Sequence, residues 1–272
     1  MERIKQALER AKKERDQGGT TRKPALIRTP ANRPAPVSSD KIVYTETKVF
    51  HPDQAVLDRN RVIGGASATA ATDAYRMLRT RVLQRMRDNN WTSLMVTSAG
   101  VSEGKSLTAV NLAISLAREV SHTVLLVDLD LRRPGVHEFF GYEPKAGLVD
   151  VLESTATMSE VMFNPGIERL VVLPARRRVE NSSELLSSPE MLGIIAEIKS
   201  RYPERIVIFD MPPVLATDDA LAFSPNADAV LLVVAEGQTG HSELGTVYEV
   251  LNDCNILGTV LNKAEGYTTA YY

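Results

Sequence analysis

Gly104, Lys105 and Ser106 follow one another directly and have the chemistry that a phosphate group needs. They come after the apolar run "SLMVTSA" and begin a helix-forming segment, so they stand where a strand gives way to a helix. Unblocked backbone N–H groups, the positive end of a helix, a flexible ammonium group and a hydroxyl able to hold Mg²⁺ come together there. The sequence therefore predicts a nucleotide site formed by these residues: Gly100, Ser102, Glu103, Gly104, Lys105, Ser106 and Leu107.

Three aspartates follow two later apolar runs. "VLLVDLDLRRP" places Asp128 and Asp130 two residues apart, on the same side of an extended chain, and "IVIFDMPP" has Asp210 at the end of its apolar part. The carboxyl ends of parallel strands meet at the crevice where open α/β sheets bind ligands. Mg²⁺ prefers hard oxygen ligands together with water and phosphate, so we expect Ser106, Asp128 and Asp210 to hold it.

Six apolar runs indicate how these residues are positioned. Several are continuously apolar and rich in β-branched residues, as expected of strands that helices cover on both faces. Strands and helices alternate, which predicts an α/β fold of three layers with an open, mostly parallel sheet. The expected strands are residues 93–99, 122–130, 169–175, 205–213, 227–237 and 255–263, and the expected helices lie at about 72–88, 105–119, 189–201 and 241–253.

The composition is that of a globular protein. The chain has 272 residues, of which 43% are hydrophobic and 24% charged, enough for one large domain and an arm. No apolar stretch is long enough to cross a bilayer and the start lacks the apolar core of a signal peptide, so we expect a cytoplasmic protein. A single cysteine, Cys254, excludes an internal disulfide, and the four histidines form no cluster that would indicate a transition metal.

The first part of the chain differs from the rest. Residues 1–39 carry ten lysines and arginines against four acidic residues, a net charge of +6, whereas the remainder carries −8. Residues 2–16 have the spacing of a short amphipathic helix, and residues 17–41 have the composition of a flexible linker. We expect three regions: an N-terminal helix and linker over 1–60, a phosphate-binding domain over 61–265, and a tail over 266–272 that reads "GYTTAYY".

The motifs resemble those of the bacterial tyrosine kinases (BY-kinases) of capsule and exopolysaccharide synthesis. "SAGVSEGKS" resembles their Walker A motif, "VLLVDLDLRRP" their Walker A′ motif and "IVIFDMPPVLATDDA" their Walker B motif. Further matches are "DAYRMLRTR", "LPARRRVENSSELLSSPEM" and "GTVLNKAEG", so the resemblance covers roughly residues 60–272. It implies a P-loop fold related to the MinD/ParA ATPases. The N-terminal helix and linker resemble the subgroup encoded with exosortase-type polysaccharide systems.

This chain departs from the family pattern at several positions. Val101 and Ser102 stand where the family usually has Pro-Gly, which could reshape the loop and lower the turnover. The oligomerisation motif E-x-x-R-x-x-R is represented by Asp73, Arg76 and Arg79, whose acid is one methylene shorter. A lysine near the start of the loop is typical of MinD-type ATPases. Its position is held here by Gly100, which argues against that branch.

The resemblance implies an ATP-dependent protein-tyrosine autokinase. Lys105 and the loop N–H groups would hold the β- and γ-phosphates, with Mg²⁺ at Ser106, Asp128 and Asp210. Asp130 would accept or orient the tyrosyl proton, because a phenol with a pKa near 10 must be partly deprotonated when it attacks. Arg132 or Arg133 would neutralise charge on the transferred group, and we take Arg132 as the candidate. The catalytic residues expected from the resemblance are thus Lys105, Asp128, Asp130, Arg132 and Asp210.

The terminal tyrosines become the expected phosphate acceptors. Tyr267, Tyr271 and Tyr272 would enter the site of a neighbouring subunit in a homo-oligomeric ring. The resemblance also implies a membrane-embedded activator of the polysaccharide co-polymerase type, a tyrosine phosphatase, and recruitment to the inner face of the plasma membrane. No nucleic acid is expected as a partner. Two alternatives stay open: a MinD/ParA-like ATPase switch that phosphorylates no tyrosine, and a regulator that binds nucleotide without catalysis.

Overall fold

The computed structural model describes residues 47–64, 69–202 and 204–265. The predicted N-terminal helix and linker, and all three tail tyrosines, lie outside the described residues. The description below concerns the predicted phosphate-binding domain and the short segment that precedes it.

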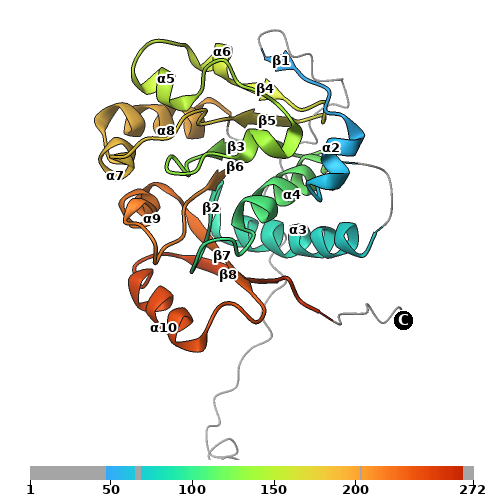
Figure 1. The fold of residues 1–272 in the computed structure, drawn as a ribbon, viewed down its shortest axis with the longest axis vertical. Helices are drawn as coiled ribbons and strands as arrows, with labels where there is room; N and C mark the ends of the chain where they lie inside the picture. Colours follow the sequence, from blue (N-terminus) through green and yellow to red (C-terminus); the bar gives the residue numbers. More distant parts are fainter. Residues whose placement is uncertain (1–46, 65–68, 203, 266–272) are drawn as a thin grey trace, which may run out of the picture. The chain divides into compact units, whose positions relative to one another are not determined.

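Within the described residues, the domain is built on one eight-stranded sheet with the order β1-β4-β5-β3-β6-β2-β7-β8 (Figure 1). All neighbouring strands are parallel except β4 and β5. This arrangement confirms the predicted mostly parallel sheet. The strands are β1 (Lys48–Val49), β2 (Ser93–Ser98), β3 (Thr123–Asp128), β4 (Phe163–Asn164), β5 (Leu170–Leu173), β6 (Arg205–Asp210), β7 (Ala229–Ala235) and β8 (Ile256–Asn262).

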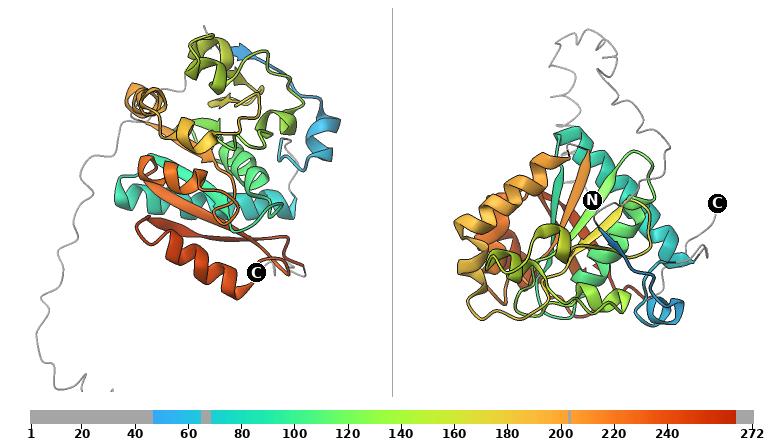
Figure 2. Two further views of the ribbon diagram at one scale, coloured as in Figure 1. Left: turned by 60° about the vertical axis from the view of Figure 1, so that its left-hand side comes forward. Right: turned by 90° about the horizontal axis from the view of Figure 1, so that it is seen from above.

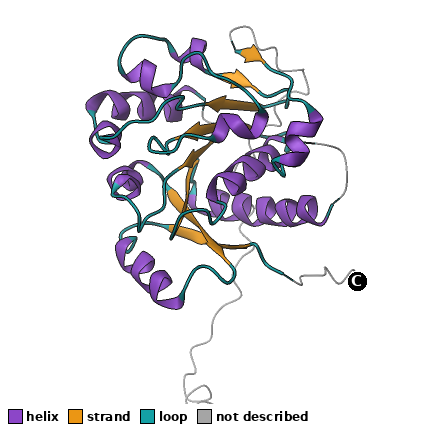
Figure 3. Ribbon diagram, in the orientation of Figure 1, coloured by secondary structure: helices purple, strands orange, loops and turns teal. Residues whose placement is uncertain are grey.

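Helices cover both faces of this sheet, which gives the predicted three layers (Figures 1 and 3). One face carries α3 (Ala70–Asn89) and α4 (Lys105–Ala117), and the opposite face carries α8 (Pro189–Arg201) and α10 (His241–Val250). All four helices were predicted within a few residues of these bounds. The shorter helices are α2 (Gln54–Arg59), η1 (Val136–Phe140), α5 (Leu148–Leu152), α6 (Met158–Val161), α7 (Ser182–Leu186), α9 (Asp219–Phe223) and η2 (Ser224–Asn226).

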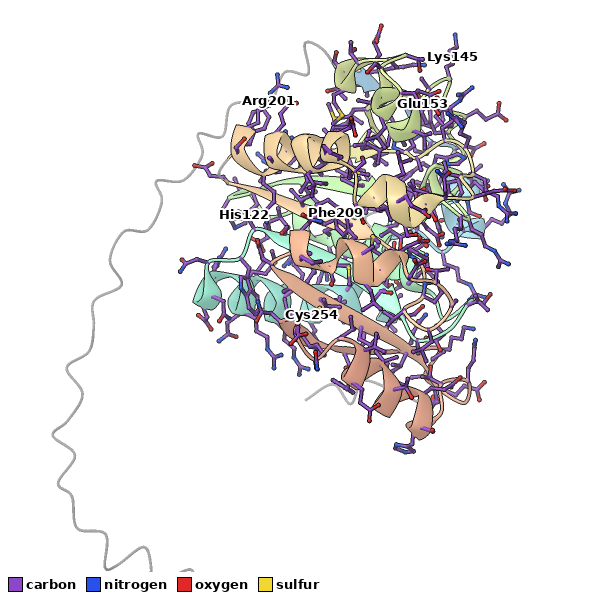
Figure 4. All side chains as sticks on the ribbon, turned by 90° about the vertical axis from the view of Figure 1, so that its left-hand side faces the viewer. His122, Lys145, Glu153, Arg201, Phe209 and Cys254 are labelled. Atoms are coloured by element: carbon purple, nitrogen blue, oxygen red, sulfur yellow. The ribbon has the colours of Figure 1, made fainter. Side chains whose placement is uncertain are left out.

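Successive side chains along each strand point to opposite faces of the sheet, so the core consists of two clusters, one on each face. In β2 all residues are buried; Leu94 and Val96 pack with α3 and α4, whereas Met95 packs with the opposite layer. Figure 4 views that opposite layer, in which Phe209 of β6 packs edge to face on Phe223 of α9 with ring centroids 4.8 Å apart. Burial on both faces explains why these strands are continuously apolar in sequence.

Residues 47–60, which the sequence assigned to the N-terminal arm, contribute β1 and α2, drawn in blue in Figure 2. β1 extends the sheet beside β4. Leu57 of α2 is buried in the core, and the side-chain amide of Asn60 donates to the carbonyl of Glu138 at 2.9 Å. The described part of the domain therefore includes segments that precede residue 61.

Candidate active site

The phosphate loop joins β2 to α4 and ends at Gly104, which has φ +92°. L-residues with a side chain rarely adopt this conformation, and a Cβ at this position would also collide with the side-chain amide of Asn262. α4 begins without a side-chain cap, so the N–H groups of its first turn stay available to a ligand. The loop therefore has the backbone of an anion site at the place that the sequence predicted.

The ammonium group of Lys105 lies among the predicted carboxylates. Its Nζ is 2.7 Å from Asp130 Oδ2, 3.6 Å from Asp210 Oδ1 and 3.1 Å from the hydroxyl of Ser106. Burial acts to lower the pKa of Lys105, but the negative charges of Asp210 and Asp130 outweigh it and raise the pKa. Lys105 is therefore a fixed positive charge in a buried acidic site.

Asp128 and Asp210 lie side by side because they are register partners at the ends of β3 and β6. Asp128 is fully buried, and Asp210 is nearly so. Burial, reinforced by the charge of Asp210, raises the pKa of Asp128 to about 8. Burial also raises the pKa of Asp210, although Lys105 opposes the shift. Two adjacent carboxylates that resist ionisation together form a site that favours a cation.

Backbone amides fix the orientation of Asp128 and Asp130. Asp128 Oδ2 accepts hydrogen bonds from the N–H groups of Gly135 and Val136, both at 3.0 Å. Asp130 Oδ1 accepts from the N–H of Arg133 at 3.0 Å, which leaves Oδ2 to face Lys105. The turn after β3 therefore holds both carboxylates in defined positions at the carboxyl edge of the sheet.

The donor set fits a magnesium ion that is completed by phosphate. Lys105 Nζ lies 3.1 Å from the Ser106 hydroxyl and 3.6 Å from Asp210 Oδ1, and Asp210 is the register partner of Asp128, so the predicted oxygen ligands Ser106, Asp128 and Asp210 lie in one site. Within residues 47–64, 69–202 and 204–265, no group of three or more His, Cys, Asp or Glu side chains is arranged to hold a metal by itself. A cation here would thus need oxygens from water and phosphate, as Mg²⁺ does.

Arg132 is held by acidic residues at the start of α9. Its Nε donates to Asp219 Oδ2 at 2.9 Å, and its terminal nitrogen lies 3.5 Å from Asp218 Oδ1. Asp219 is fully buried and also accepts a hydrogen bond from the hydroxyl of Ser182 at 2.8 Å. Asp219 therefore connects the turn after β3, which carries Arg132, to α7 and α9. Asp219 was not identified as a site residue from the sequence.

Glu103 faces the protein interior. Its side chain is buried, with Oε2 accepting from the N–H of Ala99 at 3.0 Å and Oε1 accepting from the hydroxyl of Thr239 at 2.6 Å. These bonds leave its backbone to contribute to the predicted phosphate site. Thr239 lies in none of the motifs identified in the sequence. Asn262, whose side-chain amide donates to the carbonyl of Glu103 at 2.8 Å, lies in the "GTVLNKAEG" match.

Ser102, at one of the two departures from the family loop, has φ +60°. A left-handed conformation costs a residue with a Cβ roughly 1–2 kcal/mol, whereas glycine adopts it freely. The loop thus keeps at Ser102 a backbone shape that suits glycine, and it stores strain there.

The predicted oligomerisation residues lie on α3 but differ in exposure. Asp73 and Arg76 are paired at 2.9 Å, and the Arg76 side chain is 53% exposed. Arg79 is only 20% exposed; it lies 3.2 Å from Glu119 and donates to the carbonyl of Ser115. Arg79 therefore ties α3 to the end of α4, whereas Asp73 and Arg76 lie at the surface.

Comparisons with known proteins agree with the motifs. A family model described as an AAA domain matches residues 94–260. Tyrosine-protein kinase YwqD of Bacillus subtilis is 35% identical over 208 residues, which are 76% of this chain and 86% of that protein. The succinoglycan biosynthesis transport protein ExoP of Rhizobium meliloti is 29% identical over 76% of this chain, and this chain spans only 26% of its length.

Solved structures lead to the same family. The kinase domain of Escherichia coli tyrosine kinase ETK superposes with a TM-score of 0.66 at 26% identity, covering 83% of this chain and 94% of that one. No helix among the residues that the structure describes combines the length and the apolar composition needed to cross a bilayer. The P-loop fold shared with these proteins implies that the chain binds a nucleotide. With its sequence, fold and site in agreement, the chain belongs to the bacterial tyrosine kinases (BY-kinases), a family of protein-tyrosine kinases.

Proposed function

We propose that this protein is an ATP-dependent autokinase that phosphorylates its own C-terminal tyrosines in trans, and that it thereby regulates exopolysaccharide or capsule synthesis and export. The observation that carries the proposal is the cluster of Lys105, Asp128, Asp130 and Asp210 beside a phosphate loop. Tyr267, Tyr271 and Tyr272 are the proposed acceptors; they follow shortly after β8, whose last residue, Asn262, contacts that loop.

Lys105 and the first-turn N–H groups of α4 would bind the β- and γ-phosphates of ATP. Ser106, Asp128 and Asp210 would hold Mg²⁺, which supplies positive charge to the phosphate oxygens. The raised pKa values of Asp128 and Asp210 support this assignment, because paired buried carboxylates are stabilised most by a cation that shares them.

Asp130 would accept the proton of the attacking tyrosine. The phenolic oxygen forms a bond to the γ-phosphorus, the bond between that phosphorus and the bridging oxygen breaks, and ADP leaves. The phenolic proton passes to the carboxylate of Asp130, which the N–H of Arg133 orients. Arg132 would contribute positive charge at the edge of the site. Its present partner, Asp219, fixes where its side chain lies.

The proposed partners follow from the polysaccharide role. A membrane-embedded activator of the co-polymerase type would stimulate the kinase and recruit it to the inner face of the plasma membrane, and a tyrosine phosphatase would reverse the modification. The similarity to ExoP, a protein named for succinoglycan transport, supports this assignment. The exposed Arg76, paired with the half-buried Asp73 at the surface, supports a ring in which each tail reaches the next subunit.

Mixing two variants of the full chain tests transfer in trans. One variant, Lys105→Met, keeps the acceptor tyrosines but loses the phosphate-binding ammonium group. The other has Tyr267, Tyr271 and Tyr272 replaced by Phe and keeps the active site. Incubated with ATP, Mg²⁺ and the activating segment, neither variant alone should acquire tail phosphotyrosine, whereas the mixture should phosphorylate the Lys105→Met chain, as read by mass spectrometry of the tail peptide.

A matched control is Lys145→Met, which changes an exposed lysine on the surface; Lys145 is labelled in Figure 4. Its tail should be phosphorylated like that of the unchanged chain. ATP hydrolysis without any phosphotyrosine would contradict the proposal and indicate an ATPase switch. Nucleotide binding with neither hydrolysis nor phosphotyrosine would indicate a regulator instead.

A further inference from the structure

The phosphate loop is held from outside by the segment that joins β7 to α10. The side-chain amide of Gln238 donates to the carbonyl of Val101 at 2.8 Å, and the hydroxyl of Thr239 donates to Glu103 Oε1 at 2.6 Å. The same Thr239 oxygen accepts the N–H of Ala235 at 3.0 Å. Two consecutive side chains thus contact the middle of the loop, and Thr239 is itself anchored to the end of β7.

Glu103 transmits the Thr239 contact across the loop. Its carboxylate bridges Thr239 on one side and the N–H of Ala99, at the start of the loop, on the other. The side chain is only 2% exposed, so each bond that it loses cannot be replaced by water without opening the loop. The Thr239 hydroxyl therefore has a large influence on the shape of the loop.

The loop needs these contacts because the conformation of one of its residues, Ser102, is unfavourable for a residue with a side chain. Ser102, between Val101 and Glu103, has φ +60°, and strained backbone of this kind persists only when the surroundings impose it. The contacts of Gln238 and Thr239 fall on the two residues that flank Ser102. The strain and the external contacts are thus located at the same three positions.

We propose that Gln238 and Thr239 are positioning residues of the phosphate loop, which hold it in the conformation that binds nucleotide. The inference rests on the proposed function of the loop as the ATP site. These residues do not touch the reacting atoms; they act through Val101 and Glu103.

The same contacts reach the end of β8. Lys263 Nζ donates to Gln238 Oε1 at 3.0 Å, and Glu236 accepts the N–H of Glu265 at 2.7 Å. Asn262 donates from its side chain to the carbonyl of Glu103. Residues 236–239 therefore bridge the phosphate loop and the last described residues of the chain, so the loop and this chain end are expected to move together.

Titration of the full chain with a fluorescent ATP analogue and Mg²⁺ tests the proposal. Thr239→Val keeps the side-chain volume and removes the hydroxyl, so the dissociation constant should rise about tenfold, equivalent to about 1.4 kcal/mol. Gln238→Ala, at an exposed position, should raise it about threefold by the same scale. The matched control is Thr246→Val on α10, whose hydroxyl bonds only the carbonyl of Ser242 among the described contacts; it should bind like the unchanged chain.

A kinetic readout separates positioning from a general loss of structure. At saturating ATP, Thr239→Val should keep most of its kcat while its KM for ATP rises, because a fraction of loops in the wrong conformation lowers apparent affinity alone. Thr239→Ser, which keeps the hydroxyl, should bind ATP as tightly as the unchanged chain. In a Ser102→Gly background, where the strain is removed, the Thr239→Val penalty should shrink to about threefold.

Wild-type affinity in both Thr239→Val and Gln238→Ala would overturn the inference while leaving the proposed kinase intact. A fall in kcat with unchanged KM would overturn it as well, since it would place Thr239 in the chemical step. If the unchanged chain binds no nucleotide, the inference and the proposed function both fail.

Discussion

Lys105 Nζ lies 2.7 Å from Asp130 Oδ2, so the ammonium group proposed to bind phosphate is ion-paired with the carboxylate proposed to accept the tyrosyl proton. Bound phosphate and Asp130 therefore compete for one positive charge. The competition couples nucleotide binding to the chemical step, because a phosphate that draws Lys105 away also frees Asp130 to take a proton.

This relationship predicts opposite effects of Asp130→Asn on binding and on catalysis. Removal of the negative charge should strengthen ATP binding several-fold by Coulomb's law at the short distances of a buried site. Loss of the proton acceptor should lower kcat by roughly 10²–10⁴-fold. Calorimetric titration with a non-hydrolysable ATP analogue and a phosphotransfer assay measure the two effects. Weaker binding together with unchanged kcat would contradict the assigned role; Asp253→Asn, which changes an exposed aspartate outside the site, is the control.

The buried aspartates predict how stability depends on pH when the protein is kept in EDTA. The pKa of Asp128 is about 8, far above its unfolded value, so the folded chain binds more protons than the unfolded chain between these values. The contribution of Asp128 to stability should therefore be greatest at acid pH and should fall as pH rises towards 8. Thermal unfolding across this range should show a slope that Asp128→Asn flattens. An equal pH dependence of the unfolding temperature in the unchanged chain and in Asp128→Asn would contradict the raised pKa of Asp128.

Two adjacent aspartates at the start of α9 give a matched test of the Arg132 contact. Asp219 is fully buried between Arg132 and Ser182, whereas the Asp218 side chain is 68% exposed. Asp219→Asn should cost about 2–3 kcal/mol of stability, because it weakens hydrogen bonds of a buried charged acceptor. Asp218→Asn should cost less than about 0.5 kcal/mol, as is usual at exposed positions. Denaturant unfolding measures both, and similar costs would show that Asp219 is not the anchor.

The exposed half of the α3 motif predicts a change in assembly. Arg76→Ala should shift the oligomer towards monomer with an unfolding temperature close to that of the unchanged chain, since Arg76 pairs only with nearby Asp73 in the described structure. Arg79→Ala should also lower stability, because Arg79 joins α3 to α4. Light scattering after size exclusion measures the mass. Arg81→Ala, at an exposed position of the same helix, is the control, and an unchanged mass for Arg76→Ala would argue against this interface.

The sequence was sufficient for those parts of the fold that depend on long, regular patterns. Strands buried on both faces need continuous apolar runs, and several of the six longer strands have them, whereas the edge strand β8 is only partly buried. All six were predicted from their apolar runs. The two-residue strands β1 and β4 were not, because two residues carry no periodicity. The predicted meeting of Lys105, Asp128, Asp130 and Asp210 is confirmed, since each follows directly from a strand end or from the loop after β2.

Residues that act through another side chain escaped prediction. Thr239 and Asp219 reach the site by hydrogen bonds between segments that are far apart in sequence, 136 residues between Thr239 and Glu103 and 87 between Asp219 and Arg132. Their side-chain types, a threonine and an aspartate near helix starts, are common at such positions for capping alone. Only the arrangement of the strands in three dimensions distinguishes Thr239 and Asp219 from residues that merely cap a helix.

The position of β2 in the sheet has a consequence for the synthesis of the protein. β2 carries the phosphate loop, yet both of its neighbours, β6 and β7, come more than one hundred residues later in the chain. A nascent chain that has left the ribosome only as far as β5 exposes β2 with neither edge paired, and long-range pairing of this kind is slow to form. Asp210 also arrives only with β6. The chain is therefore expected to gain a working site only after β6 and β7 have been synthesised, which would keep shorter nascent chains from consuming ATP or modifying neighbouring proteins.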